Sequence, residues 1–156
     1  MKSLESKLLT NPLTPEHWIQ VEGIYNSIRR ERGILFWDWP PNITWLRVRY
    51  LKRLRVGQTR RTLGSLSWKL GLENQVNATL SLHRELFEFP DPMLLRGVIH
   101  HEMIHLLLGP EAQHDSEFKK MEQEWDDYEI YDILKSAMFA SLRMLRDEDS
   151  QIRLVE

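Results

Sequence analysis

The run Met93–Leu108, MLLRGVIHHEMIHLLL, constrains the fold more than any other part of the chain. It lies between Asp91-Pro92, a pair that suits the start of a helix, and Gly109-Pro110, a pair that stops one. Nearly every residue of the run other than histidine is apolar, so we expect a helix that is buried on most sides. Three histidines nevertheless carry titratable rings into these apolar surroundings.

His101, Glu102 and His105 form an HExxH motif inside this predicted helix. Residues i and i+4 project from one face of a helix, about 5–6 Å apart at Cβ. Two imidazoles at that spacing can both bind one zinc ion through bonds of about 2.0–2.1 Å. Glu102 is offset from that face by one residue, so it can reach a water on the metal and act as its general base.

A catalytic zinc ion usually takes three protein ligands, and His114 is the predicted third one. It follows His105 in the sequence, just beyond the Gly-Pro turn, and shares a helical stripe with Phe118. Glu122 and Glu124 are the alternatives, since a glutamate on the following helix serves this role in thermolysin-type sites. The distance between the motif and His114 is too long for the HExxHxxGxxH motif of the metzincins.

The rest of the chain predicts a small sheet and further helices. Thr14-Pro15 suits the start of a helix that Gly33 ends. Three segments within residues 43–86 alternate polar and apolar residues, which predicts three short strands, most simply an antiparallel meander. Two more helices are expected over residues 114–125 and 127–146. The predicted fold class is therefore α+β, with a small antiparallel sheet packed on the HExxH helix and on further helices.

The length and composition of the chain predict one domain over residues 1–156, with residues 1–13 as a loose arm and residues 147–156 as a frayed tail. There is no cysteine, so disulfides and thiolate ligands are excluded and any zinc must bind histidine and carboxylate. The first residues lack the apolar region of a secretory signal, and no apolar run is long enough to span a bilayer. We therefore expect a cytoplasmic protein with no membrane partner.

The segments LGSLSWKL, NATLSLHREL and LLRGVIHHEMIHLLLG, followed by a later histidine and phenylalanine, resemble the SprT-like, or Spartan-type, metalloprotease domain. The resemblance covers roughly residues 43–125. It implies a zincin-like α+β fold, with one zinc ion on His101, His105 and His114 and with Glu102 as the general base. It also implies hydrolysis of peptide bonds, which better-known members direct at proteins bound or crosslinked to DNA.

The chain departs from the family pattern in two places. The family often has His-Gly before an aromatic residue, where this chain has His114-Asp115 ahead of Phe118. Many members also carry a C-terminal zinc ribbon built from cysteines, which a chain without cysteine cannot form. We therefore expect a bare catalytic domain that is not recruited to DNA through a ribbon.

The charge distribution predicts a second kind of partner. The segment between Pro40 and Leu72 has no acidic residue, and Trp45, Tyr50 and Trp68 are interleaved with its basic residues. Basic side chains neutralise phosphates and aromatic rings stack on bases, so single-stranded DNA is a predicted partner; the alternative is a solvated basic surface. The predicted contacts are Arg47, Arg49, Lys52, Arg53, Arg55, Arg60 and Arg61.

These residues are compatible with three different functions. The leading one is a zinc-dependent endopeptidase of SprT-like type, which would hold a protein or peptide substrate against the edge strand of the sheet, predicted around Asn77–His83. The first alternative is a thermolysin-like minimal peptidase with a glutamate as third ligand and no role at DNA. The second is a non-catalytic DNA or protein adaptor with a structural zinc, which would not need Glu102 as a base. Tyr131 is expected in the core, and His100 at the surface or beside the ligands.

Overall fold

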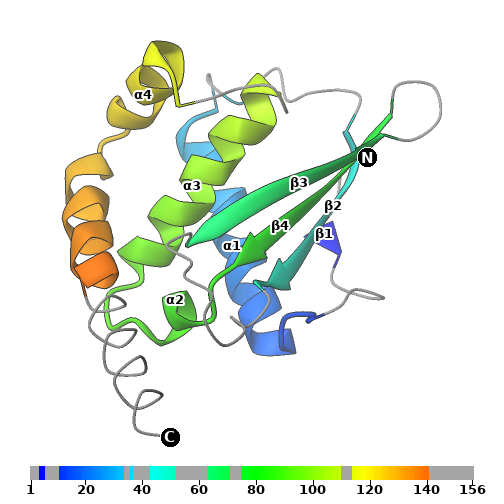
Figure 1. Cartoon of the computed structure of the whole chain (residues 1–156), viewed down its shortest axis with the longest axis horizontal. Helices are drawn as coiled ribbons and strands as arrows, with labels where there is room; N and C mark the ends of the chain where they lie inside the picture. Colours follow the sequence, from blue (N-terminus) through cyan, green and yellow to red (C-terminus); the bar gives the residue numbers. More distant parts are fainter. Residues whose placement is uncertain are drawn as a thin grey trace, which may run out of the picture.

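The computed structural model of the chain describes residues 4–5, 11–33, 36, 43–51, 63–70, 75–109 and 114–140. Over these residues the fold is α+β, with one small mixed sheet and several helices (Figure 1). The strands are β1 (Leu4–Glu5), β2 (Ile43–Tyr50), β3 (Gly64–Leu70) and β4 (Val76–Leu82). The α+β class that the sequence predicts is confirmed.

The strand order is β1-β2-β4-β3, so the predicted antiparallel meander is wrong. β4 pairs in parallel with β2 and antiparallel with β3. Tyr50 at the end of β2 and Gly64 at the start of β3 both pair with Leu82, which means that β4 lies between two strands that are consecutive in the sequence. Alternation of polar and apolar residues determines which face a strand buries but does not determine which strand lies beside it.

The prediction that Asn77–His83 forms the edge strand is also wrong, because β4 has a neighbouring strand on each side. The edge beside the long apolar helix is β3 instead. Alternate residues of β2 and β4 are at most 2% exposed, and together they form the buried face of the sheet. These residues are Leu46, Val48, Ala78 and Leu80.

The described residues of the predicted loose arm, residues 1–13, make defined contacts with the sheet and the core. Leu4–Glu5 pairs with β2 as a short parallel strand, and the N–H of Tyr50 donates to the carbonyl of Asn11. Leu13 is buried in the core. These contacts attach the N-terminal segment to β2. The predicted frayed tail, residues 147–156, lies outside the described residues.

The first long helix, α1 (Pro15–Glu31), begins as its sequence predicts. The side-chain oxygen of Thr14 accepts a hydrogen bond from the N–H of His17, at 3.2 Å, and Pro15 occupies a position that needs no donor. One apolar stripe at helical spacing faces the core. Its buried members are Val21, Tyr25 and Ile28.

The long apolar helix, α3 (Met93–Leu108), follows a single turn, α2 (Glu85–Glu88). The carboxylate of Asp91 accepts a hydrogen bond from the N–H of Met93, at 2.9 Å, where the helix begins. Gly109 ends the helix with a φ of 100°, a backbone conformation that favours glycine. Ten of the 16 residues of α3 are buried, which confirms the burial that its composition predicts.

Two helices follow α3. The first is α4 (Ser116–Gln123), where the carboxylate of Asp115 accepts a hydrogen bond from the N–H of Phe118 at 3.0 Å. The second spans residues 128–140. Both agree with the helices predicted over residues 114–125 and 127–146, as far as the chain is described; residues 141–146 lie outside that part.

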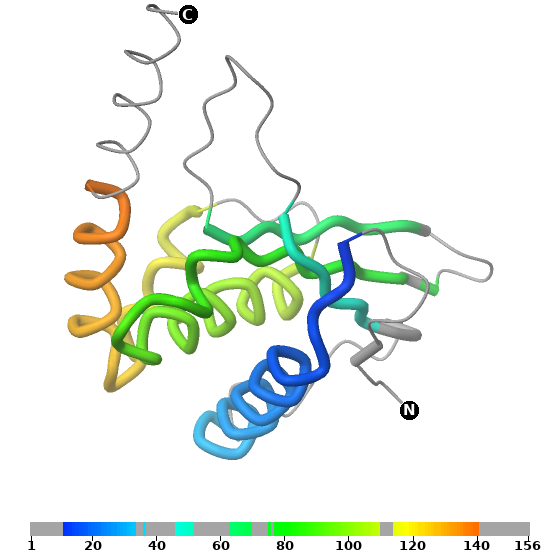
Figure 2. The backbone as a smooth tube through the Cα atoms, turned by 90° about the horizontal axis from the view of Figure 1, so that it is seen from below, coloured from blue at the N-terminus to red at the C-terminus, as the bar shows by residue number. Residues whose placement is uncertain are grey.

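The helices cover one face of the sheet, and α3 lies between α1 and the helical residues 128–140 (Figure 2). A single hydrophobic cluster joins the buried face of the sheet to these helices. The arrangement places one side of α3 against the edge strand β3. Among the described residues, no helix has the length and apolar character needed to cross a lipid bilayer.

Candidate metal centre

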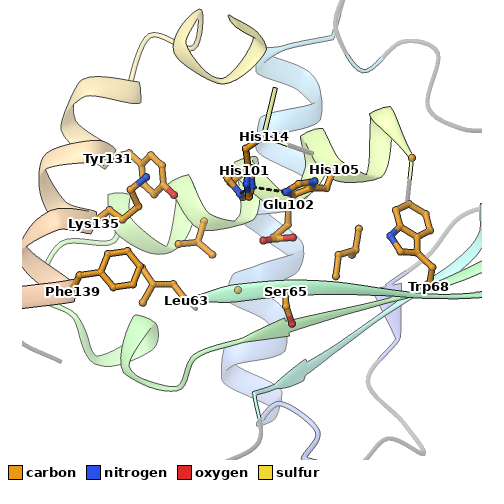
Figure 3. Close-up of a pocket in the computed structure, with 14 residues that line it drawn as sticks. Leu63, Ser65, Trp68, His101, Glu102, His105, His114, Tyr131, Lys135 and Phe139 are labelled. Atoms are coloured by element: carbon orange, nitrogen blue, oxygen red, sulfur yellow. Dashed lines mark hydrogen bonds between the residues drawn. The ribbon is translucent and has the colours of Figure 1, made fainter. Parts of the chain in front are cut away.

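Three histidines converge over α3. One turn separates His101 from His105, so their rings share a face of the helix, with ring centroids 5.0 Å apart. His114, which precedes α4, meets them from the opposite side (Figure 3): its Nε2 lies 3.0 Å from Nε2 of His101 and 3.0 Å from Nε2 of His105. Zinc-bound nitrogen atoms in a tetrahedral site lie about 3.3 Å apart, so the three rings fit a metal ion.

The ring of Phe118, on the first turn of α4, supports all three histidines. Its centroid lies 4.8 Å from that of His101, 4.4 Å from that of His105 and 4.9 Å from that of His114. Phe118 is 1% exposed, so it excludes water from one side of the group. A single apolar ring therefore restricts the orientation of three imidazoles that come from two separate segments.

Glu122 on α4 orients the ring of His101 through a hydrogen bond to Nδ1, the nitrogen that does not face the other two histidines. Its Oε2 lies 2.6 Å from Nδ1 of His101, and the side chain is buried. A carboxylate can only accept, so Nδ1–H donates and the lone pair of Nε2 faces His105 and His114. This is the tautomer that a metal ligand needs. Neither Glu122 nor the exposed Glu124, the alternative third ligands, belongs to the group of three converging side chains.

The other two histidines are also held in the form that binds metals. Burial lowers the pKa of His105 to about 4, and the neighbouring charges of His101 and His114 lower it further. Burial is likewise the first cause that lowers the pKa of His114, followed by the charge of His101. Both imidazoles are therefore neutral at pH 7, which leaves their lone pairs available to a cation.

Glu102 lies beneath the histidines with only 5% of its surface exposed. Figure 3 shows its carboxylate directed away from the three rings and toward β3, on the side of Ser65. Burial raises the pKa of Glu102 to about 7, with the charge of Glu122 adding to the rise and that of His101 opposing it. A carboxyl group with a pKa near neutrality can both accept and release a proton at pH 7.

The backbone of β3 approaches Glu102 closely because residue 64 is a glycine. A Cβ atom on Gly64 would lie 2.8 Å from Cγ1 of Val98 and 3.6 Å from Oε1 of Glu102. Any side chain here would therefore push the edge strand away from α3. The Leu63-Gly64 pair brings the start of β3 within reach of the HExxH motif.

A cavity of about 480 Å³ runs between α3, β3 and the helical residues 128–140. His101, Glu102, His105 and His114 all line it, so the three ligand candidates and the carboxylate share one solvent-accessible space. The edge strand contributes the remaining wall on that side. Its lining residues are Gly64, Ser65, Leu66 and Trp68.

Tyr131, Lys135 and Phe139 line the cavity from the helix 128–140, and none of them was predicted there. Tyr131 is 3% exposed, as expected of a core residue, yet its hydroxyl points toward the histidines (Figure 3). Burial and the charges of Glu122 and Glu102 raise its pKa. The spacing of four residues places all three on one helical face, which is a signal in the sequence, but nothing in the sequence shows what that face meets.

His100 is buried, so the surface position that was one of the two expected for it is wrong. It is 0% exposed, its ring stacks on that of Trp125 at 4.2 Å, and its Nε2 lies 2.8 Å from Nη1 of Arg32. Burial lowers the pKa of His100 to about 3, and the charge of Arg32 lowers it further. The same nitrogen of Arg32 donates to the carbonyl of Met121, at 2.7 Å. His100 therefore helps to join α1, α3 and α4.

Two of the seven residues predicted to contact DNA lie in described segments. Arg47 and Arg49 are half-buried in β2, where Nε of Arg49 donates to the hydroxyl of Ser81 at 3.0 Å. Trp68, one of the aromatic residues of the basic segment, lines the cavity instead of accompanying these arginines. The other five, Lys52, Arg53, Arg55, Arg60 and Arg61, lie outside the described residues, so the contact to DNA stays a prediction.

Comparison with known families matches residues 44–133 to the SprT-like family. The matched region begins in β2 and ends in the helix 128–140, so it includes the three converging histidines and Glu102. A search of curated proteins found no match, and neither did a search of solved structures. Because the family match covers more than half of the 156 residues, the chain belongs to the SprT-like family.

Proposed function

We propose that the chain is a zinc-dependent endopeptidase with a zincin-like arrangement of its catalytic groups. The observation that carries this proposal is the convergence of three imidazole nitrogens, two of them from α3, in the same cavity as Glu102, a buried glutamate of α3. Membership of the SprT-like family supports it, because the family is associated with metalloprotease-like domains. His101, His105 and His114 would hold the metal, and Glu102 would be the catalytic residue.

The proposed reaction is hydrolysis of a peptide bond. A zinc ion held by three imidazoles supplies a Lewis acid that lowers the pKa of water and polarises a carbonyl. Glu102 would accept the proton of the attacking water on its carboxylate and then donate it to the leaving nitrogen. A pKa of about 7 for Glu102 suits both steps. Glu122 would keep the proton of His101 on Nδ1 throughout.

β3 would hold the substrate, in place of the strand that the sequence suggested. It has β4 on one side only, and its other side borders the cavity. An extended peptide could add to this edge through backbone hydrogen bonds, which would carry its scissile carbonyl past Glu102. Proline at Leu66, whose N–H faces away from β4, should lower peptide turnover, because that N–H would pair with the substrate.

The geometry disfavours both alternatives. A structural zinc site usually has four protein ligands, whereas the described group has three and opens on a cavity. A thermolysin-like site needs a glutamate among its ligands, and Glu122 instead bonds to the outer nitrogen of His101. The peptidase proposal therefore accounts for more of the site than either alternative does.

The deciding experiment combines metal content with cleavage of an unfolded protein. Glu102→Gln should bind zinc as the parent does while turnover falls by at least about a hundredfold, because only the proton transfer is lost. His114→Ala should lose tight zinc binding. Full cleavage by Glu102→Gln would rule out the proposed base, and unchanged zinc affinity in His114→Ala would return a glutamate to the ligand set.

The DNA part of the proposal rests on the basic segment and on the resemblance to DNA-directed members of the family. Proteins bound or crosslinked to DNA would be the substrates, and single-stranded DNA would bring enzyme and substrate together. Cleavage of a DNA-binding protein should rise when single-stranded DNA is added, and Glu102→Gln should abolish it. Cleavage that is indifferent to DNA would leave a general peptidase.

A further inference from the structure

The cavity has two chemically different halves on either side of the histidines. Figure 3 shows Trp68 on one side of His101 and His114, with Lys135 and Phe139 on the other. The residues of β3 that line the cavity, which include Trp68, are all uncharged. The half beside Lys135 has an apolar wall with one ammonium group in it.

Lys135 is suited to bind an anion from within this wall. Its side chain is 28% exposed, and its Nζ lies 5.2 Å from the centroid of the Tyr131 ring. Nζ lies 3.6 Å from the carboxylate of Asp132, which belongs to a 49% exposed side chain and so binds Nζ weakly. An ammonium group has three donors, so Lys135 keeps hydrogen-bonding capacity for a second carboxylate.

Lys135 also lies close to the candidate metal centre. Its positive charge is one of the causes that lower the pKa of His114, and both residues line the same cavity. Among the described residues that line the cavity, Lys135 is the one with a permanent positive charge. A carboxylate in this half would therefore be attracted, whereas a cationic side chain would be repelled.

The direction of β3 determines which part of a substrate reaches Lys135. β3 runs from Gly64, beside Leu63 and Phe139, to the half that contains Trp68. Antiparallel pairing is the more stable kind of strand addition, so a peptide on this edge would run the opposite way. Its residues before the scissile bond would lie near Trp68, and those after the bond would lie near Lys135.

We infer, on the basis of the proposed peptidase function, that Lys135 makes the enzyme select substrates with an acidic residue immediately after the scissile bond. Leu63, Tyr131 and Phe139 would pack on the aliphatic part of that side chain, and Nζ of Lys135 would bind its carboxylate. Lys135 is thus a specificity-determining residue, while proton transfer remains with Glu102. The substrate class is peptide segments with a glutamate or aspartate at that position.

The test uses the full chain loaded with zinc and peptides that differ at one position. Peptides with Glu, Gln or Lys after the scissile bond should differ in kcat/KM, with Glu preferred over Gln by about tenfold. The difference should lie mainly in KM, because the contact is made before the reaction. Lys135→Met should abolish the preference, Lys135→Arg should keep it, and Lys135→Glu should shift it to Lys.

The exposed Lys119 on α4 provides a matched control. Its charge also acts on His114, but it does not line the cavity, so Lys119→Met should retain the preference for Glu. A preference that survives in Lys135→Met would overturn the inference, as would one at the residue before the scissile bond. An equal fall of kcat for all three peptides in Lys135→Met would do the same, since it would show a role in the reaction itself.

A binding experiment separates this inference from the peptidase proposal. Labelled peptides are titrated into Glu102→Gln, with and without Lys135→Met, and fluorescence anisotropy is read. The Glu peptide should bind about tenfold more tightly than the Gln peptide, and only while Lys135 is present. Equal affinities would overturn the inference even if the parent cleaves peptides. Absence of any cleavage with charge-dependent binding intact would overturn the peptidase proposal instead.

Discussion

Oε2 of Glu122 lies 2.6 Å from Nδ1 of His101, so a buried carboxylate on α4 determines where the proton sits on a ring of α3. The two residues are 21 positions apart in the sequence. Their contact joins the helix of the HExxH motif to the helix that follows His114. One hydrogen bond therefore serves both the tautomer of His101 and the packing of the segment that supplies the third histidine.

Replacement of Glu122 should weaken metal binding without removing a ligand. In Glu122→Gln the amide cannot hold the proton on Nδ1 as strongly, so zinc affinity should fall by about 10–100-fold in competition with a chelator. Glu124→Gln, an exposed neighbour at the end of α4, should leave affinity unchanged. A loss in Glu122→Gln as large as that in His114→Ala would mean that Glu122 itself binds the metal.

Two glycine substitutions should act in opposite directions on stability. A Cβ on Gly97 would clash with the ring of Tyr131, so Gly97→Ala should lower the free energy of unfolding by about 1–3 kcal/mol. Gly23 is exposed in α1 with nothing within 4 Å of its Cβ position, so Gly23→Ala should raise it by about 0.5–1 kcal/mol. Urea denaturation measures both. Equal effects of the two changes would mean that Tyr131 does not pack on α3 at Gly97.

Loss of the Arg32 side chain should loosen α4. Its Nη1 bonds both to His100 and to the carbonyl of Met121, the residue before Glu122. Arg32→Met removes the guanidinium donor from these two acceptors, one of which belongs to the fully buried His100, so the free energy of unfolding should fall by about 1–3 kcal/mol. Zinc affinity should fall with it, because Glu122 moves with Met121. Arg30→Met, an exposed control on α1, should change neither quantity.

The stability of the metal-free protein should depend on the protonation of His100. Its pKa is about 3 in the folded chain against an ordinary value of 6.5, because of burial and the charge of Arg32. Between these values the unfolded chain binds a proton that the folded chain does not, so the free energy of unfolding decreases as the pH falls. Over this window the parent should lose up to about 1.4 kcal/mol per pH unit more than His100→Gln. Parallel slopes for the two proteins, from urea titrations at several pH values, would contradict a neutral buried His100.

The local features of the chain are the ones that its sequence predicts well. Thr14 caps α1, the carboxylate of Asp91 accepts from the N–H of Met93 at the start of α3, and Gly109 ends α3, because these effects involve residues only a few positions apart. The same holds for His101 and His105, whose separation of four residues alone places their rings on one face. His114 was within reach of the sequence because it follows His105 by only nine positions, although it precedes α4 and does not lie on the predicted helical stripe.

Contacts between distant segments were decided only by the tertiary structure. The strand order, with β4 between β2 and β3, depends on pairing that alternation does not encode, and it made β3 the edge of the sheet. The position of Glu122 behind His101 depends on how α4 packs on α3. Lys135 faces the cavity because Gly97 lets the helix 128–140 approach α3 at Tyr131. Sequence alone determined which side chains share a helical face, whereas packing between segments far apart in the chain determined what each face meets.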